Sequence, residues 1–232
     1  MAMVATKKKT SRPSAKPKKM TRDELRHDEF IDHVVDYWEW ARKNATMVGG
    51  VVGALLLLVV GSTWWVNARE DAKIEASNML ATAQLNAATA TPLYDEIVSE
   101  YDGTPAAGKA AFMLAKKYLE DGDVVQAKTY FKKYINGYDT DNFLGQGAMA
   151  GLADCLVREG NNAEAAGYYE KAAKINMGHP QAEAYLYSAA AAYQAAGNSE
   201  KARAIAQSMI DSKDTDQTFR GRAEILLKDL GE

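Results

Sequence analysis

Apolar positions dominate one segment of the chain, between Lys43 and Arg69. No charged residue lies between these two, and residues 47–66 read MVGGVVGALLLLVVGSTWWV. A helix of this length rises about 30 Å, which matches the hydrocarbon thickness of a membrane. The pattern therefore predicts a single N-terminal transmembrane helix over residues 46–66.

A cleaved signal peptide is the alternative interpretation of this segment, since Val66, Asn67 and Ala68 resemble a small-residue cleavage site. Signal peptides carry an apolar region of about 7–15 residues close to the start of the chain. This run is longer and 46 residues precede it, and Trp64 and Trp65 stand where interfacial aromatic residues belong. We therefore expect a retained membrane anchor.

Two different patterns precede the predicted span. Residues 1–20 are rich in Lys, Ser and Thr and contain no apolar cluster, which predicts a disordered basic tail. Thr21 and Glu24 then have the spacing of a capping box, so a helix is expected over residues 21–43. Its apolar positions recur at helical spacing and predict an amphipathic juxtamembrane helix: Phe30, Val34, Trp38 and Ala41.

Beyond the span the sequence repeats itself and contains no alternating strand pattern. Gly122, Gly160 and Gly197 recur at intervals of 38 and 37 residues, each with an Ala seven residues before it and another five residues after it. Glycine can end a helix in the left-handed conformation, and the Asp or Asn that follows can cap the next helix. An all-α chain is therefore predicted, in which three helical hairpins stack into an α-solenoid.

These positions resemble the tetratricopeptide repeat, which places a small residue, an aromatic residue, a Gly and a second Ala at the same offsets. The sequence departs from that pattern where Ala111, Met149 and Leu186 replace the usual tryptophan. Residues 67–104 are expected to form a long connecting helix, from about Val66 to Ala88, and a lead-in helix. Residues 105–232 are expected to form the tetratricopeptide-like repeats, with a C-terminal capping helix over 215–230.

The order of these parts resembles a bacterial inner-membrane tetratricopeptide-repeat-like family, the ancillary subunits of the Sec translocon. The resemblance covers the architecture of about residues 25–230. It implies a periplasmic chaperone adaptor that binds emerging chains or docks a membrane-anchored foldase of the parvulin type. The implied partners are proteins: the Sec translocon, such a periplasmic foldase, or unfolded clients.

The first helix of each repeat lines a concave groove in the tetratricopeptide pattern, and the resemblance assigns this chain a protein-binding groove on those helices. A mixed apolar and charged lining suits a bound peptide or partner helix. Eight residues are assigned to it: Phe112, Lys116, Leu119, Asp154, Val157, Arg158, Tyr187 and Gln194. Lys116, Asp154 and Ala191 occupy one equivalent position, which departs from the clamp that binds C-terminal carboxylates. The alternative role of each side chain is to cover a neighbouring repeat.

Gly49, Gly50 and Gly53 form a second candidate surface, in the first half of the predicted span. Small residues four positions apart let another membrane helix approach closely, which predicts membrane helix packing there. Because Gly is common in membrane helices generally, a plain anchor is the alternative.

Charge differs on the two sides of the span. Residues 1–46 hold 11 Lys and Arg against 7 Asp and Glu, whereas residues 67–232 hold 17 against 24. Short basic flanks stay in the cytoplasm, whereas long domains cross largely regardless of charge. Together with the family resemblance, this predicts a single-pass protein of the bacterial inner membrane with a cytoplasmic N-terminus and a periplasmic C-terminal domain. The basic tail is expected to act as a topology signal, and binding of anionic lipid or RNA is its alternative role.

The sequence contains little that could support catalysis. Its three His are scattered, Cys155 is its one cysteine, and it has no phosphate loop, nucleophile elbow or paired metal ligands. Cys155 lies in the first helix of a repeat, where a small buried thiol is expected. We therefore expect no enzyme activity, cofactor, metal or small-molecule substrate, and nucleic acid is not the expected partner.

Three functions agree with these patterns. The first is the translocon-associated chaperone adaptor, which the resemblance favours. The second is a cell-envelope assembly or division scaffold that uses the same solenoid. The third is a regulatory anchor whose cytoplasmic tail binds nucleic acid or a signalling partner.

Overall fold

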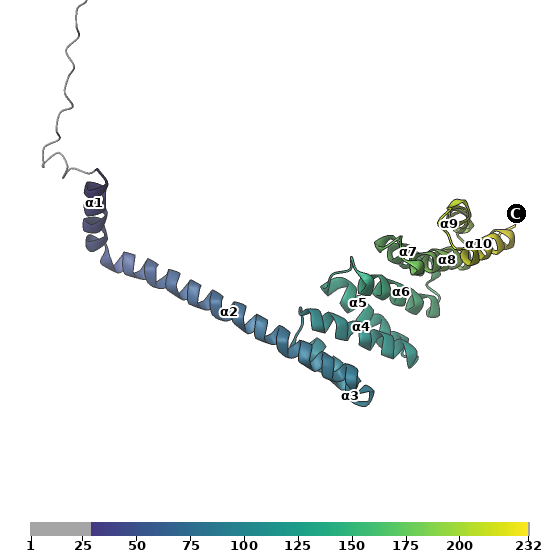
Figure 1. The fold of residues 1–232 in the computed structure, drawn as a ribbon, viewed down its shortest axis with the longest axis horizontal. Coiled ribbons are helices and arrows are strands. Elements are labelled where there is room, and N and C mark those ends of the chain that lie inside the picture. The colour runs from purple at the N-terminus through teal and green to yellow at the C-terminus, as the bar shows by residue number, and fades with distance from the viewer. Residues whose placement is uncertain (1–28, 232) are drawn as a thin grey trace, which may run out of the picture. The chain divides into compact units, whose positions relative to one another are not determined.

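The computed structural model describes residues 29–231, and within that range every regular element is an α-helix (Figure 1). The predicted all-α fold is therefore confirmed. The chain divides into two units, residues 1–64 and residues 65–232. The predicted basic tail and the capping box of Thr21 and Glu24 lie outside the described residues.

The first unit contains helix α1 (Glu29–Lys43) and the first part of helix α2 (Ala45–Leu85). Asn44 separates the two helices, and both its backbone N–H and its side-chain amide donate to the carbonyl of Trp40, at 3.0 and 2.9 Å. Three aromatic side chains of α1 are exposed: Tyr37, Trp38 and Trp40. No placement is described for the side chain of Phe30, so that part of the predicted apolar stripe lies outside the described side chains.

Helix α2 is long and apolar enough to cross a membrane, and none of its most apolar window is buried. A separate connecting helix that begins near Val66 would require α2 to end with the apolar run, but α2 does not end there. It continues to Leu85 because residues 67–85 are rich in Ala and also contain Leu, Glu, Lys and Gln, which favour a helix. Asn86 then separates α2 from the lead-in helix α3 (Ala87–Glu100).

Six helices beyond Thr104 form three antiparallel pairs, and a seventh helix follows them (Figure 1). The pairs are α4 (Pro105–Glu120) with α5 (Val124–Gly137), α6 (Phe143–Arg158) with α7 (Asn162–Ile175), and α8 (Pro180–Ala195) with α9 (Ser199–Asp211). Helix α10 (Gln217–Asp229) packs on α9 and α8. The predicted stacking of helical hairpins into an α-solenoid is confirmed, and α10 lies within the range 215–230 expected for the last helix.

The three repeated glycines have positive φ angles of 84°, 80° and 76° at Gly122, Gly160 and Gly197. Each turn is closed in the same way, as when the N–H of Asp123 donates to the carbonyl of Tyr118 at 2.8 Å. This is the hydrogen bond of a Schellman motif, which satisfies a carbonyl left free at the helix end.

The predicted caps on the second helices are confirmed at two of the three turns. The side chain of Asp123 accepts from the N–H of Gln126, and that of Asn198 from the N–H of Lys201. The prediction is wrong for Asn161, whose side chain makes no cap hydrogen bond to the backbone. Its amide instead donates to the carboxylate of Glu159 at 3.4 Å.

Small buried residues let the paired helices approach closely. The alanines on both sides of each repeated glycine are all fully buried: Ala115, Ala127, Ala153, Ala165, Ala190 and Ala202. Buried side chains form two clusters, one around the end of α2, α3 and α4, and one through the repeats. Four partly buried side chains pack against both clusters: Met113, Tyr118, Tyr130 and Tyr138.

Candidate protein-binding surface

The first helices of the repeats carry the predicted groove residues at helical spacing. Phe112, Lys116 and Leu119 follow one face of α4, because residues three or four apart stack along a helix. Helix α6 carries the next three and α8 the last two. The residues of the predicted groove therefore lie on the first helices of three successive pairs. Two of these first helices, α4 and α6, contact each other directly.

Phe112 differs from its predicted role. Its side chain is only 8 % exposed, and its ring packs edge-to-face on Phe131 and Tyr134, with centroids 6.1 Å away in both cases. A Cβ added at Gly147 of α6 would lie 3.0 Å from the ring, so this glycine makes room for it. Phe112 is thus a core residue, and little of its ring is available to a partner.

The other predicted residues of α4 divide between surface and core. Lys116 is exposed. Leu119 is half-buried and packs against the core of the repeats. On this helix a partner would therefore meet mainly a lysine side chain, rather than the aromatic ring that the sequence pattern assigned.

Helix α6 presents an apolar side chain between charged ones. Val157 is 41 % exposed, and Arg158 beside it is also exposed. The carboxylate of Asp154 accepts a hydrogen bond from the hydroxyl of Tyr169 on α7. Burial raises the pKa of Asp154 above its ordinary value, although this hydrogen bond and the charge of Arg158 oppose the shift. Asp154 is therefore solvent-exposed and also hydrogen-bonded to Tyr169 within the solenoid.

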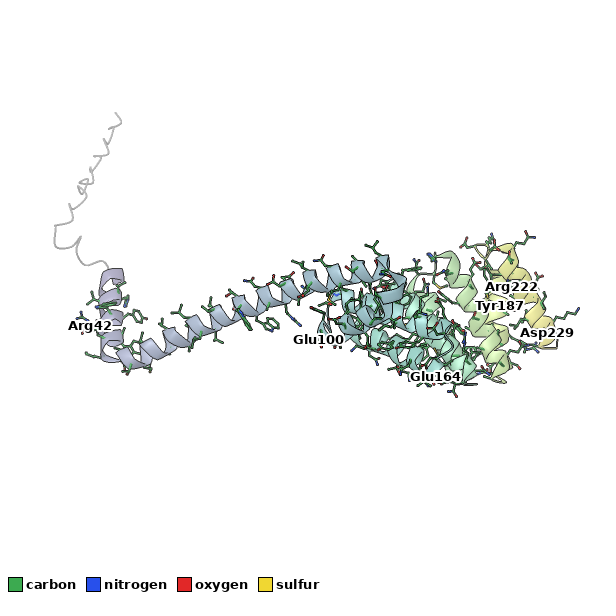
Figure 2. All side chains as sticks on the ribbon, turned by 90° about the horizontal axis from the view of Figure 1, so that it is seen from below. Arg42, Glu100, Glu164, Tyr187, Arg222 and Asp229 are labelled. Carbon is green, nitrogen blue, oxygen red and sulfur yellow. The ribbon has the colours of Figure 1, made fainter. Side chains whose placement is uncertain are left out.

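Helix α8 meets the capping helix at Tyr187. The guanidinium carbon of Arg222 on α10 lies 5.8 Å from the centroid of the Tyr187 ring and 5.3 Å from that of Phe219. Figure 2 labels Tyr187 and Arg222 at this end of the solenoid. Tyr187 and Gln194 are both half-buried. A cation over an aromatic ring stabilises this contact by about 0.5–1 kcal/mol at an exposed site.

Arg222 and Phe219 are surface residues that the sequence analysis did not assign. They lie three positions apart on the predicted capping helix, so they share one face of it. That spacing was visible in the sequence. The pattern did not indicate that the face would lie against Tyr187, because α10 belongs to no repeat.

Two clefts lie at the ends of the first helices, where the loops enter them. Each has a volume of about 430 Å³. The first is lined by residues that include Lys109, Tyr134, Tyr138 and Leu144, and the second by residues that include Met177, His179, Glu183 and Phe219. Phe143 is 59 % exposed, and its ring centroid lies 5.7 Å from that of His179. The surface around these two clefts therefore combines exposed apolar groups with hollows, and the sequence pattern did not indicate it.

Cys155 is fully buried, and burial raises the pKa of its thiol to about 11. A Cβ added at Gly49, Gly50 or Gly53 would meet no atom within 4 Å, so the surface of α2 is open at all three. Within residues 29–231, no group of three His, Cys, Asp or Glu side chains is arranged to hold a metal ion.

Two solved structures resemble this chain. Both are crystal structures of nearly identical TPR-like repeats from a Podosopora anserina protein described as a putative kinesin light chain, one of them carrying a single substitution. The substituted form has 16 % sequence identity and the other 17 %; each comparison has a TM-score of 0.47 and covers 69 % of this chain and 92 % of the other. A search of curated proteins found no match. The model of the tetratricopeptide repeat-like domain matches residues 38–230, and the chain therefore belongs to the tetratricopeptide repeat-like family.

Proposed function

We propose that this protein is a membrane-anchored scaffold that binds other proteins through the first helices of its solenoid. One observation carries the proposal. A single chain joins a tetratricopeptide-like solenoid to a helix that is long and apolar enough to span a membrane. Solenoids present extended surfaces that suit peptides and partner helices, so the anchor would hold such a surface beside the membrane.

The accessible residues of the first helices support this proposal. Lys116, Val157 and Arg158 are exposed, and Tyr187 remains half-buried beside Arg222. Arg and Tyr are enriched among the residues that contribute most to protein interfaces. This mixture of charged, aromatic and aliphatic groups favours a polypeptide partner over a purely ionic ligand.

The more specific form of the proposal is a periplasmic chaperone adaptor associated with the Sec translocon. Two arguments support it: the basic residues before the span and the acidic balance after it, and the resemblance of the architecture to that family. On this reading the N-terminus is cytoplasmic and the solenoid is periplasmic. The partners would be translocon subunits, a membrane-anchored foldase or emerging unfolded chains.

Photocrosslinking of the full-length protein in its native membrane tests the proposal. One probe replaces Val157 on α6, a first helix, and a matched probe replaces Val125 on α5, a second helix, where the side chain is 67 % exposed. We expect protein adducts from position 157 and few from position 125. Equal adducts from both positions, or none from 157, would argue against the first helices as the binding surface.

The identity of the adducts separates the three functions. Translocon subunits, a foldase or unfolded chains at position 157 support the adaptor. Cell-wall or division proteins alone support the assembly scaffold instead. Adducts obtained only from a probe within residues 1–28 would support the regulatory anchor.

A further inference from the structure

The bend between α1 and α2 contains a cleft that protein binding by the solenoid does not use. It has a volume of about 370 Å³, and its lining residues lie on both sides of Asn44 in the chain. Figure 1 shows the ribbon where α1 and α2 meet. Its lining includes Trp38, Ala41 and Arg42 of α1 and Val48, Gly49 and Val52 of α2. A Cβ at Gly49 would meet no atom within 4 Å, so the absence of a side chain there contributes open space to the cleft.

Arg42 brings the one charge among the described residues that line this cleft. Its guanidinium carbon lies 5.9 Å from the centroid of the Trp38 ring, and no carboxylate among the described side chains forms an ion pair with it. The neighbouring Lys43 differs, because its ammonium lies 3.9 Å from the carboxylate of Glu39. The cleft is therefore an apolar hollow beside a positive charge that the described side chains leave without a counter-charge.

The position of the cleft along the chain matches the boundary of a membrane. Arg42 and Lys43 immediately precede the charge-free run, whereas Val48, Gly49 and Val52 lie within it. If the run spans the hydrocarbon layer, Arg42 lies at the depth of the phosphate groups and the valines lie at the depth of the acyl chains. Trp38 then occupies the interfacial depth that tryptophan favours.

We propose that this cleft binds an anionic glycerophospholipid. The phosphate pairs with the guanidinium of Arg42, and an acyl chain lies against Val48, Gly49 and Val52. A guanidinium forms two parallel hydrogen bonds to phosphate oxygens, which makes arginine better suited than lysine to this role. This inference rests on the membrane anchoring proposed above. It also gives Gly49 a role distinct from the packing of a second membrane helix.

Quenching of Trp38 fluorescence by brominated lipid tests the proposal. The full-length protein, with Phe in place of Trp40, Trp64 and Trp65, is reconstituted into phosphatidylcholine vesicles. These contain either phosphatidylglycerol with brominated chains or phosphatidylcholine with brominated chains, at the same fraction. We expect stronger quenching by the phosphatidylglycerol. Equal quenching by the two lipids would overturn the proposal.

Two matched pairs of variants separate the cleft from general surface charge. Arg42→Gln is expected to reduce the preference for phosphatidylglycerol about fivefold, whereas Lys43→Gln, which removes the same charge outside the cleft, retains most of it. Gly49→Leu fills the cleft and is expected to reduce quenching, whereas Gly61→Leu, in the same apolar run, is not. Equal losses in Arg42→Gln and Lys43→Gln would assign the preference to surface charge and overturn the site.

A second single-tryptophan protein, which retains only Trp64, distinguishes failure of the site from failure of the anchor. If both lipids quench Trp64 but Trp38 has no preference, the lipid site is wrong and the anchor stands. If neither lipid quenches either residue, the anchor and the lipid site are both wrong. Crosslinked dimers from a probe in place of Val52, lost when Gly49→Leu is added, together with an absence of lipid preference, would show that a second helix occupies the cleft.

Discussion

The ring of Phe131 on α5 occupies the space where a side chain at Gly151 on α6 would lie. A Cβ built on Gly151 would come within 2.2 Å of Cζ of Phe131, closer than two non-bonded carbons can approach. Phe131 is 1 % exposed, so its ring has no free volume into which to move. The contact between the first and second repeats therefore depends on glycine, which has no side chain, at position 151.

Gly151→Ala is expected to destabilise the solenoid. The added methyl group must displace the buried ring, and overpacking of this kind costs about 1–3 kcal/mol of the free energy of unfolding. Thermal unfolding of the full-length protein in detergent, followed by circular dichroism, measures the effect.

Gly167→Ala is the control, because a Cβ at this helical position of α7 meets no atom within 4 Å. It should stabilise the protein by up to about 1 kcal/mol, since Ala favours a helix. A neutral Gly151→Ala would contradict the packing described here.

Asp154 should stabilise the folded state more at acidic pH than at neutral pH. Burial raises its pKa in the folded state, so the folded state binds this proton more tightly than the unfolded state does. The stabilising contribution is therefore present below the ordinary Asp pKa of about 4 and is lost as pH rises through the raised value. Relative to Asp154→Asn, the wild-type protein should become less stable as pH increases across that window. Denaturant unfolding of both proteins at pH 4 and pH 7 measures the difference, and the opposite slope would refute the prediction.

Asp102 should behave in the opposite way. The hydroxyl of Tyr138 donates to its carboxylate at 2.8 Å, and this bond, with help from Lys133, lowers its pKa. The contribution is present above the ordinary Asp pKa and is lost as pH falls through the lowered value. Asp102→Asn should therefore be less stable than the wild-type protein at pH 7, with a difference that shrinks in acid. The difference is expected to be small because Asp102 is exposed. A difference that grows as pH falls would show that this carboxylate is not stabilised in its ionised form.

Cys155 should resist alkylation while the protein is folded. Burial raises the pKa of its thiol to about 11, and only the thiolate reacts. Compared with an ordinary thiol of pKa about 8.5, the reactive fraction at pH 7 falls roughly 300-fold. Mass spectrometry after iodoacetamide treatment should detect little adduct in the native protein and complete modification in denaturant. Similar rates in the two states would show that the thiol is accessible.

The turn glycines should tolerate Asn better than Ala. Gly160 has a φ angle of 80°, a conformation that costs most L-residues about 1–2 kcal/mol. Gly160→Ala should therefore lower the free energy of unfolding by about that amount, whereas Gly160→Asn should cost less because Asn adopts this conformation more readily. Denaturant unfolding of the two variants compares them directly, and equal stabilities would exclude backbone strain as the cause.

The repeat pattern predicted the fold because it recorded local requirements. Gly122, Gly160 and Gly197 are each needed for a left-handed turn, and the buried alanines for close helix contacts. These constraints lie within one hairpin, so they can be read from its sequence. The prediction was wrong at Asn161, where the choice between a backbone cap and Glu159 depends on side-chain orientation rather than on residue type.

The exposure of the candidate groove residues was less predictable than the fold. Phe112 occupies the position that faces a groove in the repeat pattern, yet Gly147 and Gly151 on α6 let aromatic rings from α4 and α5 fill the space between the helices. The exposure of a ring thus depended on residues a whole repeat away. Arg222 was missed for a related reason, because its contact with Tyr187 joins a repeat to a helix outside the repeat pattern.

The four side chains that pack against both hydrophobic clusters have a mechanical consequence. Leu80 and Ala83, near the end of α2, are buried in the same cluster as Ile97 and Leu114, so tension applied to this end of α2 would first load that cluster. The load could pass on to the repeats through the stacked rings of Tyr118 and Tyr130, whose centroids are 5.6 Å apart. The hydroxyl of Tyr130 also donates to Asp95 of α3 at 2.5 Å, which ties that stack to the lead-in helix. A pull on α2 would therefore load these tyrosines of the first repeat before it reaches the second and third repeats.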